Sequence, residues 1–109
     1  MKLLFVIVQN DDAKALTRKL IEHNISVTRI SSSGGFLSSG NQTLMIGVEK
    51  DRLQDTLDII KAQSHKRKAI LPALLPHAGH GIDSVNLPLT ITIGGATVFV
   101  TDVDDFYKF

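Results

Sequence analysis

Residues 24–49 read NISVTRISSSGGFLSSGNQTLMIGVE, in which two runs of alternating apolar residues flank a glycine-rich loop. Before the loop, Ile25, Val27 and Ile30 mix with polar residues, and after it Leu44, Ile46 and Val48 alternate with other side chains. Alternation with a period of two is typical of half-buried strands. We predict two strands joined by the loop from Ser32 to Asn41, and we place the function at this loop.

The loop combines glycines with an apolar pair. Gly34, Gly35 and Gly40 allow positive φ and leave backbone amides uncovered, which suits an anion or a closely approaching ligand. Phe36 and Leu37 have no apolar partner within the loop, and such a pair often covers a ligand or a neighbouring subunit. The alternative is an ordinary hairpin whose glycines make the turn and whose Phe36 folds back onto its own core.

Length and composition indicate one globular domain, 1–109. The 109 residues are 43% hydrophobic and 21% charged, an ordinary balance for a chain that closes a single core. The absence of Cys excludes disulfides, thiol catalysis and Cys-ligated zinc, and agrees with a reducing cytoplasm. We therefore expect a cytoplasmic protein.

The charge pattern argues against polyanionic or membrane partners. A net charge of +1 does not supply the basic field that nucleic acids or anionic membranes require. The apolar run Leu3 to Val8 is shorter than a usual secretory core, and no stretch is long enough to span a bilayer. Any contact with phosphate is expected to be local.

The first half of the chain predicts a strand-helix-strand-strand-helix order. Leu3 to Val8 is apolar throughout, as in a central strand covered on both faces. Asp11 or Asp12 is placed to cap a helix from about Ala13 to His23, and residues 49–51 open a second helix that ends near Gln63. This order gives the first five elements of a ferredoxin-like split pattern.

The second half is less regular. Residues 64–87 contain Pro and Gly and are predicted to form a long loop, although Ala69 to Leu75 is an alternative short edge strand. Gly94-Gly95 separates two alternating runs, which predicts a hairpin, and Asp102 is placed to start a last helical turn. The expected fold is α+β, a ferredoxin-like βαββαβ with an extra C-terminal strand and short helix.

Two helices cover only one face of such a sheet, so the second face needs a cover. A homo-oligomer that packs these faces together supplies it, and closed cyclic symmetry is the default for soluble homo-oligomers. Clefts between subunits are then the natural ligand sites.

Two long motifs, one in each half of the chain, resemble a known family. The sequence is similar to the PII-like cyclic di-AMP receptor proteins, small bacterial homotrimers with a ferredoxin-like fold. The resemblance extends from Met1 to Phe109 and is carried by His23-Asn24, Val27-Thr28, Gly34-Gly35-Phe36-Leu37, Gly40-Asn41, Thr43, Met45-Ile46-Gly47-Val48-Glu49 and Gly94-Gly95-Ala96-Thr97-Val98-Phe99-Val100.

The resemblance implies one cyclic di-AMP in each cleft between neighbouring subunits of a trimer. It assigns adenine edges to the two asparagines, purine faces to the two phenylalanines, phosphate to Thr28 and the loop amides, and room for the ligand to Gly47. The matching positions are Asn24, Ser26, Thr28, Gly35, Phe36, Leu37, Asn41, Gly47, Phe99 and Lys108.

The sequence departs from the family at two of these positions. Members typically carry Arg where this chain has Ser26, and Gln where it has Lys108. Loss of one charge-assisted contact costs on the order of 1.5 to 3 kcal/mol, unless Arg29 or Lys108 compensates. Ligands other than cyclic di-AMP therefore stay open: another dinucleotide, ATP, ADP or a metal.

The resemblance further implies a non-enzymatic signalling protein without a cofactor. Ligand binding is expected to reposition the short loop, 32–41, and the long flexible loop, 64–87, and so to change what a downstream partner protein contacts. No Ser, His and acid fall together on the predicted strand ends, so catalysis has little support. His77 and His80 alone are a weak signal for a metal site.

Overall fold

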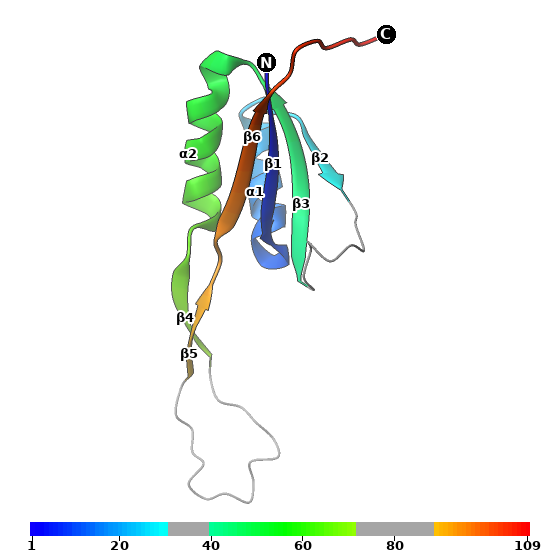
Figure 1. Cartoon of the computed structure of the whole chain (residues 1–109). Helices are drawn as coiled ribbons and strands as arrows, with labels where there is room; N and C mark the ends of the chain where they lie inside the picture. The colour runs from blue at the N-terminus through cyan, green and yellow to red at the C-terminus, as the bar shows by residue number, and fades with distance from the viewer. Residues whose placement is uncertain (31–39, 72–88) are drawn as a thin grey trace, which may run out of the picture.

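A computed structural model describes residues 1–30, 40–71 and 89–109 of the chain, with only the backbone described at Leu71 (Figure 1). The elements follow one another as β1 (Lys2–Gln9), α1 (Asn10–Glu22), β2 (Val27–Ile30), β3 (Asn41–Val48), the 3-10 turn η1 (Lys50–Arg52), α2 (Leu53–Ser64), β4 (Arg67–Leu71), β5 (Leu89–Ile93) and β6 (Ala96–Asp102).

The main sheet has four antiparallel strands in the order β2-β3-β1-β6, with α1 and α2 on one face (Figure 1). β1 is central, as its uninterrupted apolar run predicts, and β2 and β6 are the two edges. This α+β arrangement is compatible with the predicted ferredoxin-like fold, with β6 in the place of the fourth strand. Neither helix in the described residues has the length and apolarity that crossing a bilayer requires.

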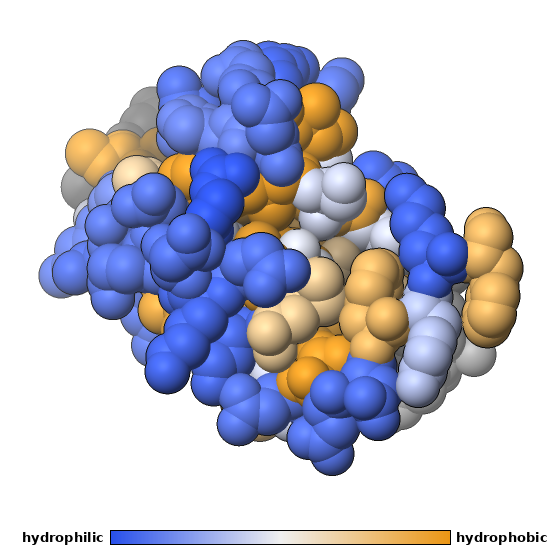
Figure 2. Space-filling model, turned by 90° about the horizontal axis from the view of Figure 1, so that it is seen from above, coloured by the Kyte–Doolittle hydropathy of each residue, from blue (hydrophilic) through white to orange (hydrophobic). Residues whose placement is uncertain are grey.

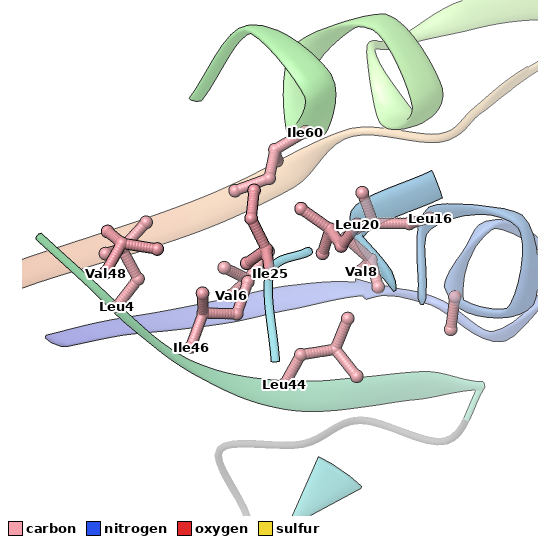
Figure 3. Close-up of a cluster of buried hydrophobic side chains, with 11 residues drawn as sticks. Leu4, Val6, Val8, Leu16, Leu20, Ile25, Leu44, Ile46, Val48 and Ile60 are labelled. Atoms are coloured by element: carbon pink, nitrogen blue, oxygen red, sulfur yellow. The ribbon is translucent and has the colours of Figure 1, made fainter. Parts of the chain in front are cut away.

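The core lies between this sheet and the two helices (Figure 3). Leu4, Val6 and Val8 alternate along β1 and are buried, because successive strand side chains point to opposite faces. Leu16 and Leu20 are one helical turn apart on α1 and cover them, with Ile60 approaching from α2. The buried set is completed by Ala13, Ile25, Leu44, Ile46 and Val48.

The segment predicted as a long loop is partly strand. β4 pairs with β5 in a separate two-stranded ribbon that extends away from the main sheet (Figure 1). The alternative strand from Ala69 captured part of β4, whose bounds are Arg67–Leu71. Residues 72–88 lie outside the described residues. This range includes His77 and His80, which were weighed above as a metal site.

The predicted hairpin around Gly94-Gly95 is wrong. β5 pairs with β4, and β6 pairs with β1, so the two glycines join two different sheets. Both have positive φ, and a Cβ on Gly94 would lie 2.5 Å from Arg67 Nη1 and from the His65 carbonyl oxygen. Glycine is therefore required here by a close approach as well as by the left-handed backbone.

The predicted capping role of Asp11 or Asp12 is also wrong. Helix α1 begins at Asn10, with Gln9 at the capping position and no side-chain capping bond. Asp12 is instead 5% exposed and accepts two hydrogen bonds from Arg67 at the base of the ribbon. The Asp12 carboxylate, which was expected to cap the helix, therefore binds Arg67 instead, a tertiary contact that the local sequence does not reveal.

The C-terminal residues 103–109 contain no helical turn, so the expected short helix at Asp102 is wrong. Asp102 remains in β6 because it lies opposite Lys2 of β1 and accepts a hydrogen bond from its ammonium. Val103 N–H then donates to the Met1 carbonyl at 3.1 Å. Beyond that contact the tail is exposed, and its Tyr107 and Phe109 rings stack with centroids 6.3 Å apart.

Candidate functional site

The face of the main sheet that the helices leave uncovered carries the candidate site. Because residues directly opposite in antiparallel strands share a face, one row across the sheet runs Thr28, Met45, Phe5, Phe99. Phe5 and Met45 are only half-buried in the single chain, and Phe99 is 49% exposed. This open face thus presents apolar side chains in its middle and candidate site residues at both edges.

β2 and β3 bring three of the predicted residues onto the open face. Asn41, Thr43, Met45 and Gly47 alternate along β3 with the core residues Leu44 and Ile46, so all four point away from the helices. Thr28 lies opposite Met45 on the neighbouring strand and is exposed. The register therefore places Thr28, Asn41 and Gly47 on one surface.

Gly47 leaves open space on this surface. A Cβ added there would meet only the Met1 sulfur, at 3.9 Å, which is an ordinary van der Waals contact. Its own chain therefore does not require glycine at this position. A ligand approaching the backbone would gain room from the missing side chain.

Asn24 lies at the same end of the sheet in a left-handed conformation, with φ of 60°. Its N–H donates to the Ile21 carbonyl at 2.9 Å, which closes the end of α1 and turns the chain into β2. Asn24 and Gly47 line one cavity of about 200 Å³, together with Met1, Ile25, Val48, Glu49 and Arg52. In the view onto this end of the molecule, hydrophilic side chains surround a central area of apolar surface (Figure 2).

Arg52 is a cavity residue that the sequence analysis missed. Its Nη2 donates to the His23 carbonyl at 2.9 Å, which fixes the guanidinium beside Asn24. It lies in η1, shortly after the β3 motif that ends at Glu49, but nothing in its local pattern marks it as a site residue. The sequence did show that a positive charge is missing at Ser26, which is exposed and precedes β2. That missing charge was the available reason to look for another cation nearby.

Arg29, which the sequence analysis considered as a replacement for the missing Arg, lies on the other face. It pairs with Leu44, whose side chain points into the core, so its own side chain shares the helix side of the sheet. One residue along the strand, Thr28 points to the open face. Period-two alternation thus removes Arg29 from the candidate site.

Phe99 belongs to the opposite edge of the sheet. Two strands, β3 and β1, lie between β2 and β6, so Thr28 and Phe99 are separated by three inter-strand spacings, about 14 Å in total. Lys108 follows β6 in the exposed tail. A single chain therefore does not bring Phe99 together with Thr28.

Gly35, Phe36 and Leu37 lie outside the described residues. Within the described parts of the chain, no group of three His, Cys, Asp or Glu side chains is placed to hold a metal ion.

Comparison with known families bears directly on this arrangement. Residues 1–109, the whole chain, match the family described as cyclic-di-AMP receptor. The chain belongs to the cyclic-di-AMP receptor family. The predicted resemblance to these receptors is thereby confirmed, and the family indicates a signalling protein whose ligand is a cyclic dinucleotide.

The receptor chain is also similar to a solved structure, the crystal structure of a functionally unknown protein from Pediococcus pentosaceus ATCC 25745. The two share 41% sequence identity with a TM-score of 0.77, and the match covers 99% of this chain and 96% of that chain. The similarity supports the fold over nearly the full length of both proteins.

Proposed function

We propose that this protein is a cyclic di-AMP receptor that binds its ligand in the clefts between subunits of a homotrimer. The observation that carries the proposal is the match to the cyclic-di-AMP receptor family over residues 1–109. Binding, rather than turnover of the dinucleotide, is the proposed activity.

The placement of the candidate residues supports a cleft between subunits. Thr28 and Phe99 point to the same face from opposite edges of one sheet. In a ring, each interface joins two different surfaces of the same protein, so the β2 edge of one subunit meets the β6 edge of the next. Each such junction unites Thr28, Asn41 and Gly47 with Phe99 and Lys108 of the neighbouring chain.

The apolar residues on the open face support the trimer itself. Leu3, Phe5, Ile7 and Met45 form a contiguous group on this face and are only partly buried in the single chain. Burial of apolar surface contributes about 25 cal/mol per Å² removed from water, so association of three open faces is favourable. The trimer thereby supplies the second cover that the two helices cannot.

Each residue has a chemical role in the proposed cleft. Asn24 and Asn41 offer the amide donor and acceptor pair that reads an adenine edge, and Phe99 offers a ring for a purine face. Thr28 donates its hydroxyl to a phosphate oxygen, and Arg52 supplies positive charge beside Asn24. Gly35, Phe36 and Leu37 are proposed to complete the site from the loop.

The proposed signalling output is a change in the surface offered to a partner protein. Asn41 is the last residue of the loop 32–41 and the first of β3, so a ligand held there lies at the base of that loop. If the ligand binds more tightly to one arrangement of the loops 32–41 and 64–87, binding shifts the population of the receptor toward that arrangement. The partner would then distinguish the bound receptor from the free one.

The test is isothermal titration of the purified protein with cyclic di-AMP. We expect saturable binding in the micromolar range or tighter, with about one site per chain, and light scattering at about three times the chain mass of 11.9 kDa. Asn41→Ala combined with Phe36→Ala is expected to abolish binding, and Phe99→Ala to weaken it strongly. Phe106→Ala is the matched control, because it removes an exposed ring from the tail.

Three results would contradict the proposal. These are a monomeric mass, an absence of heat with cyclic di-AMP, and equal effects of Phe99→Ala and Phe106→Ala. A thermal-shift panel of ATP, ADP, other cyclic dinucleotides and divalent metals identifies the alternative ligand, because a ligand specific to the folded state raises the melting temperature.

A further inference from the structure

A second groove lies on the helix side of the main sheet, where α1 runs beside the edge strand β2. It has a volume of about 360 Å³ and is lined by Lys14, Thr17, Arg18, Ile21, Glu22 and Arg29. This volume is within the range of small-molecule pockets. Among the described residues, none of the predicted receptor positions lines the groove, and Arg29 of β2, which does, points away from the open face.

The lining carries more positive charge than the described residues neutralise. Lys14, Arg18 and Arg29 take part in none of the four ion pairs formed by the described residues. The one carboxylate of the groove, on Glu22, lies 3.7 Å from the Lys19 ammonium, outside the lining. Three cations and one carboxylate leave the lining with two excess positive charges.

Thr17, which also lines the groove, has a hydroxyl that the described residues leave without a partner. This hydroxyl oxygen is buried. In α2, by contrast, Thr56 and Ser64 each donate their hydroxyls to the carbonyl four residues earlier. A buried hydroxyl left without a partner is unfavourable, and a change of the χ1 rotamer would turn it toward the groove that Thr17 lines, where a ligand oxygen can accept its hydrogen bond.

We propose that this groove binds the phosphate group of a small phosphorylated molecule. A phosphate monoester carries a charge of about −1.5 to −2 near neutral pH, which matches the excess charge of the lining. The Arg18 and Arg29 guanidiniums provide forked donors for phosphate oxygens, and Lys14 adds a point charge. Ile21, 58% exposed, gives the remainder of the ligand an apolar surface.

This site is distinct from the proposed cyclic di-AMP cleft. Arg29 and Thr28 are consecutive in β2, and strand alternation directs them to opposite faces of the sheet. A ligand in the groove therefore contacts the back of the strand whose front carries Thr28. The proposal for the groove holds whether or not the cleft binds cyclic di-AMP.

The test is titration of the full-length protein with inorganic pyrophosphate, followed by calorimetry and by ³¹P NMR. We expect saturable binding that Arg29→Gln weakens about tenfold or more, because one charge-assisted contact is lost. Lys68→Gln is the matched control, since it removes an exposed cation from β4, away from the groove. The titration is repeated with saturating cyclic di-AMP, which must leave pyrophosphate binding in place.

Thr17→Val gives a second, nearly isosteric test. It removes the unpartnered hydroxyl, so pyrophosphate binding should weaken several-fold while the melting temperature of the free protein stays the same or rises. Absence of pyrophosphate binding, equal weakening by Arg29→Gln and Lys68→Gln, or loss of binding in the presence of cyclic di-AMP overturns the proposal. Binding of a Glu-rich peptide without binding of pyrophosphate also overturns it, in favour of a protein-docking surface.

Discussion

Arg67 donates hydrogen bonds from both terminal guanidinium nitrogens to the Asp12 carboxylate, from Nη2 to Oδ1 at 2.6 Å and from Nη1 to Oδ2 at 3.3 Å. The two residues are 55 positions apart in the chain. Arg67 also donates to the His65 carbonyl at 3.1 Å. The hydrogen bond to Asp12 raises the pKa of Arg67 above its ordinary value, so the guanidinium stays charged. The contact joins the first turn of α1 to the base of the β4–β5 ribbon.

Replacement of Asp12 is expected to loosen the ribbon. Asp12→Ala leaves Arg67 without its carboxylate, and we expect the melting temperature to fall by several degrees, because a bidentate pair with one buried partner is lost. Hydrogen exchange should accelerate in Arg67–Leu71 and Leu89–Ile93 more than in β1. Asp11→Ala is the control, since Asp11 is exposed and makes no ion pair within the described residues; equal effects of the two variants would contradict the assignment.

The core is expected to respond to truncation at Leu20. Leu20→Ala removes a fully buried side chain from the layer between α1 and β1, and should lower the free energy of unfolding by about 2 to 5 kcal/mol. Ile21→Ala, at the adjacent and 58% exposed position, should change it by less than about 0.5 kcal/mol. Urea denaturation measures both, and similar losses would argue against the burial of Leu20.

A gain of affinity is expected from Ser26→Arg. This change introduces the cation that the family typically carries, and one charge-assisted contact to a phosphate of cyclic di-AMP strengthens binding about tenfold or more. Calorimetry of the two proteins measures the difference. Arg52→Gln is informative beside it: if Arg52 already supplies the missing charge, its loss weakens wild-type binding more than it weakens Ser26→Arg.

The contact between Lys2 and Asp102 predicts a pH dependence at the edge of the sheet. A hydrogen bond from Lys2, together with its charge, lowers the pKa of Asp102 below the ordinary 3.8. Because the pKa of Asp102 is lower in the folded state than in the unfolded state, the ionised carboxylate stabilises the fold at any pH above the unfolded-state pKa. This stabilisation is lost as the pH falls through the lowered, folded-state pKa.

Asp102→Asn tests this sign. The melting temperature of the variant should lie below that of wild type at neutral pH, and the gap should close well below pH 3.8. Asp104→Asn, in the exposed tail, serves as the control and should behave as wild type at both values. A gap that widens in acid would show that the pair does not act in this way.

The local sequence pattern was sufficient to predict those elements whose apolar side chains pack against a single neighbouring surface. The uninterrupted apolar run of β1 identified the central strand, and the helix predicted to end near Gln63 corresponds to α2, which ends at Ser64. The alternation in β3 also predicted which of its residues reach the open face. In these cases the period of the buried apolar residues is itself what distinguishes a strand from a helix, so the pattern predicts the element directly.

Local pattern failed where a distant partner decided the outcome. Gly94-Gly95 has the composition of a tight hairpin, but Ser64 accepts a hydrogen bond from Gly95 N–H and Gln9 from Gly94 N–H, which divides the two runs between two sheets. Asp12 has the composition of a helix cap and is used by Arg67. The positions of the site residues came from the family resemblance, and Arg52 entered only through the three-dimensional arrangement.

The separation of Thr28 and Phe99 across one sheet has a genetic consequence. If each cleft draws Asn41 from one subunit and Phe99 from the next, two impaired variants can rescue one another. Asn41→Ala chains retain a sound β6 edge and Phe99→Ala chains a sound β2 edge, so refolding the two together yields rings with an intact junction. The mixture should then bind cyclic di-AMP more tightly than either pure variant does, which is interallelic complementation between the two halves of a shared pocket.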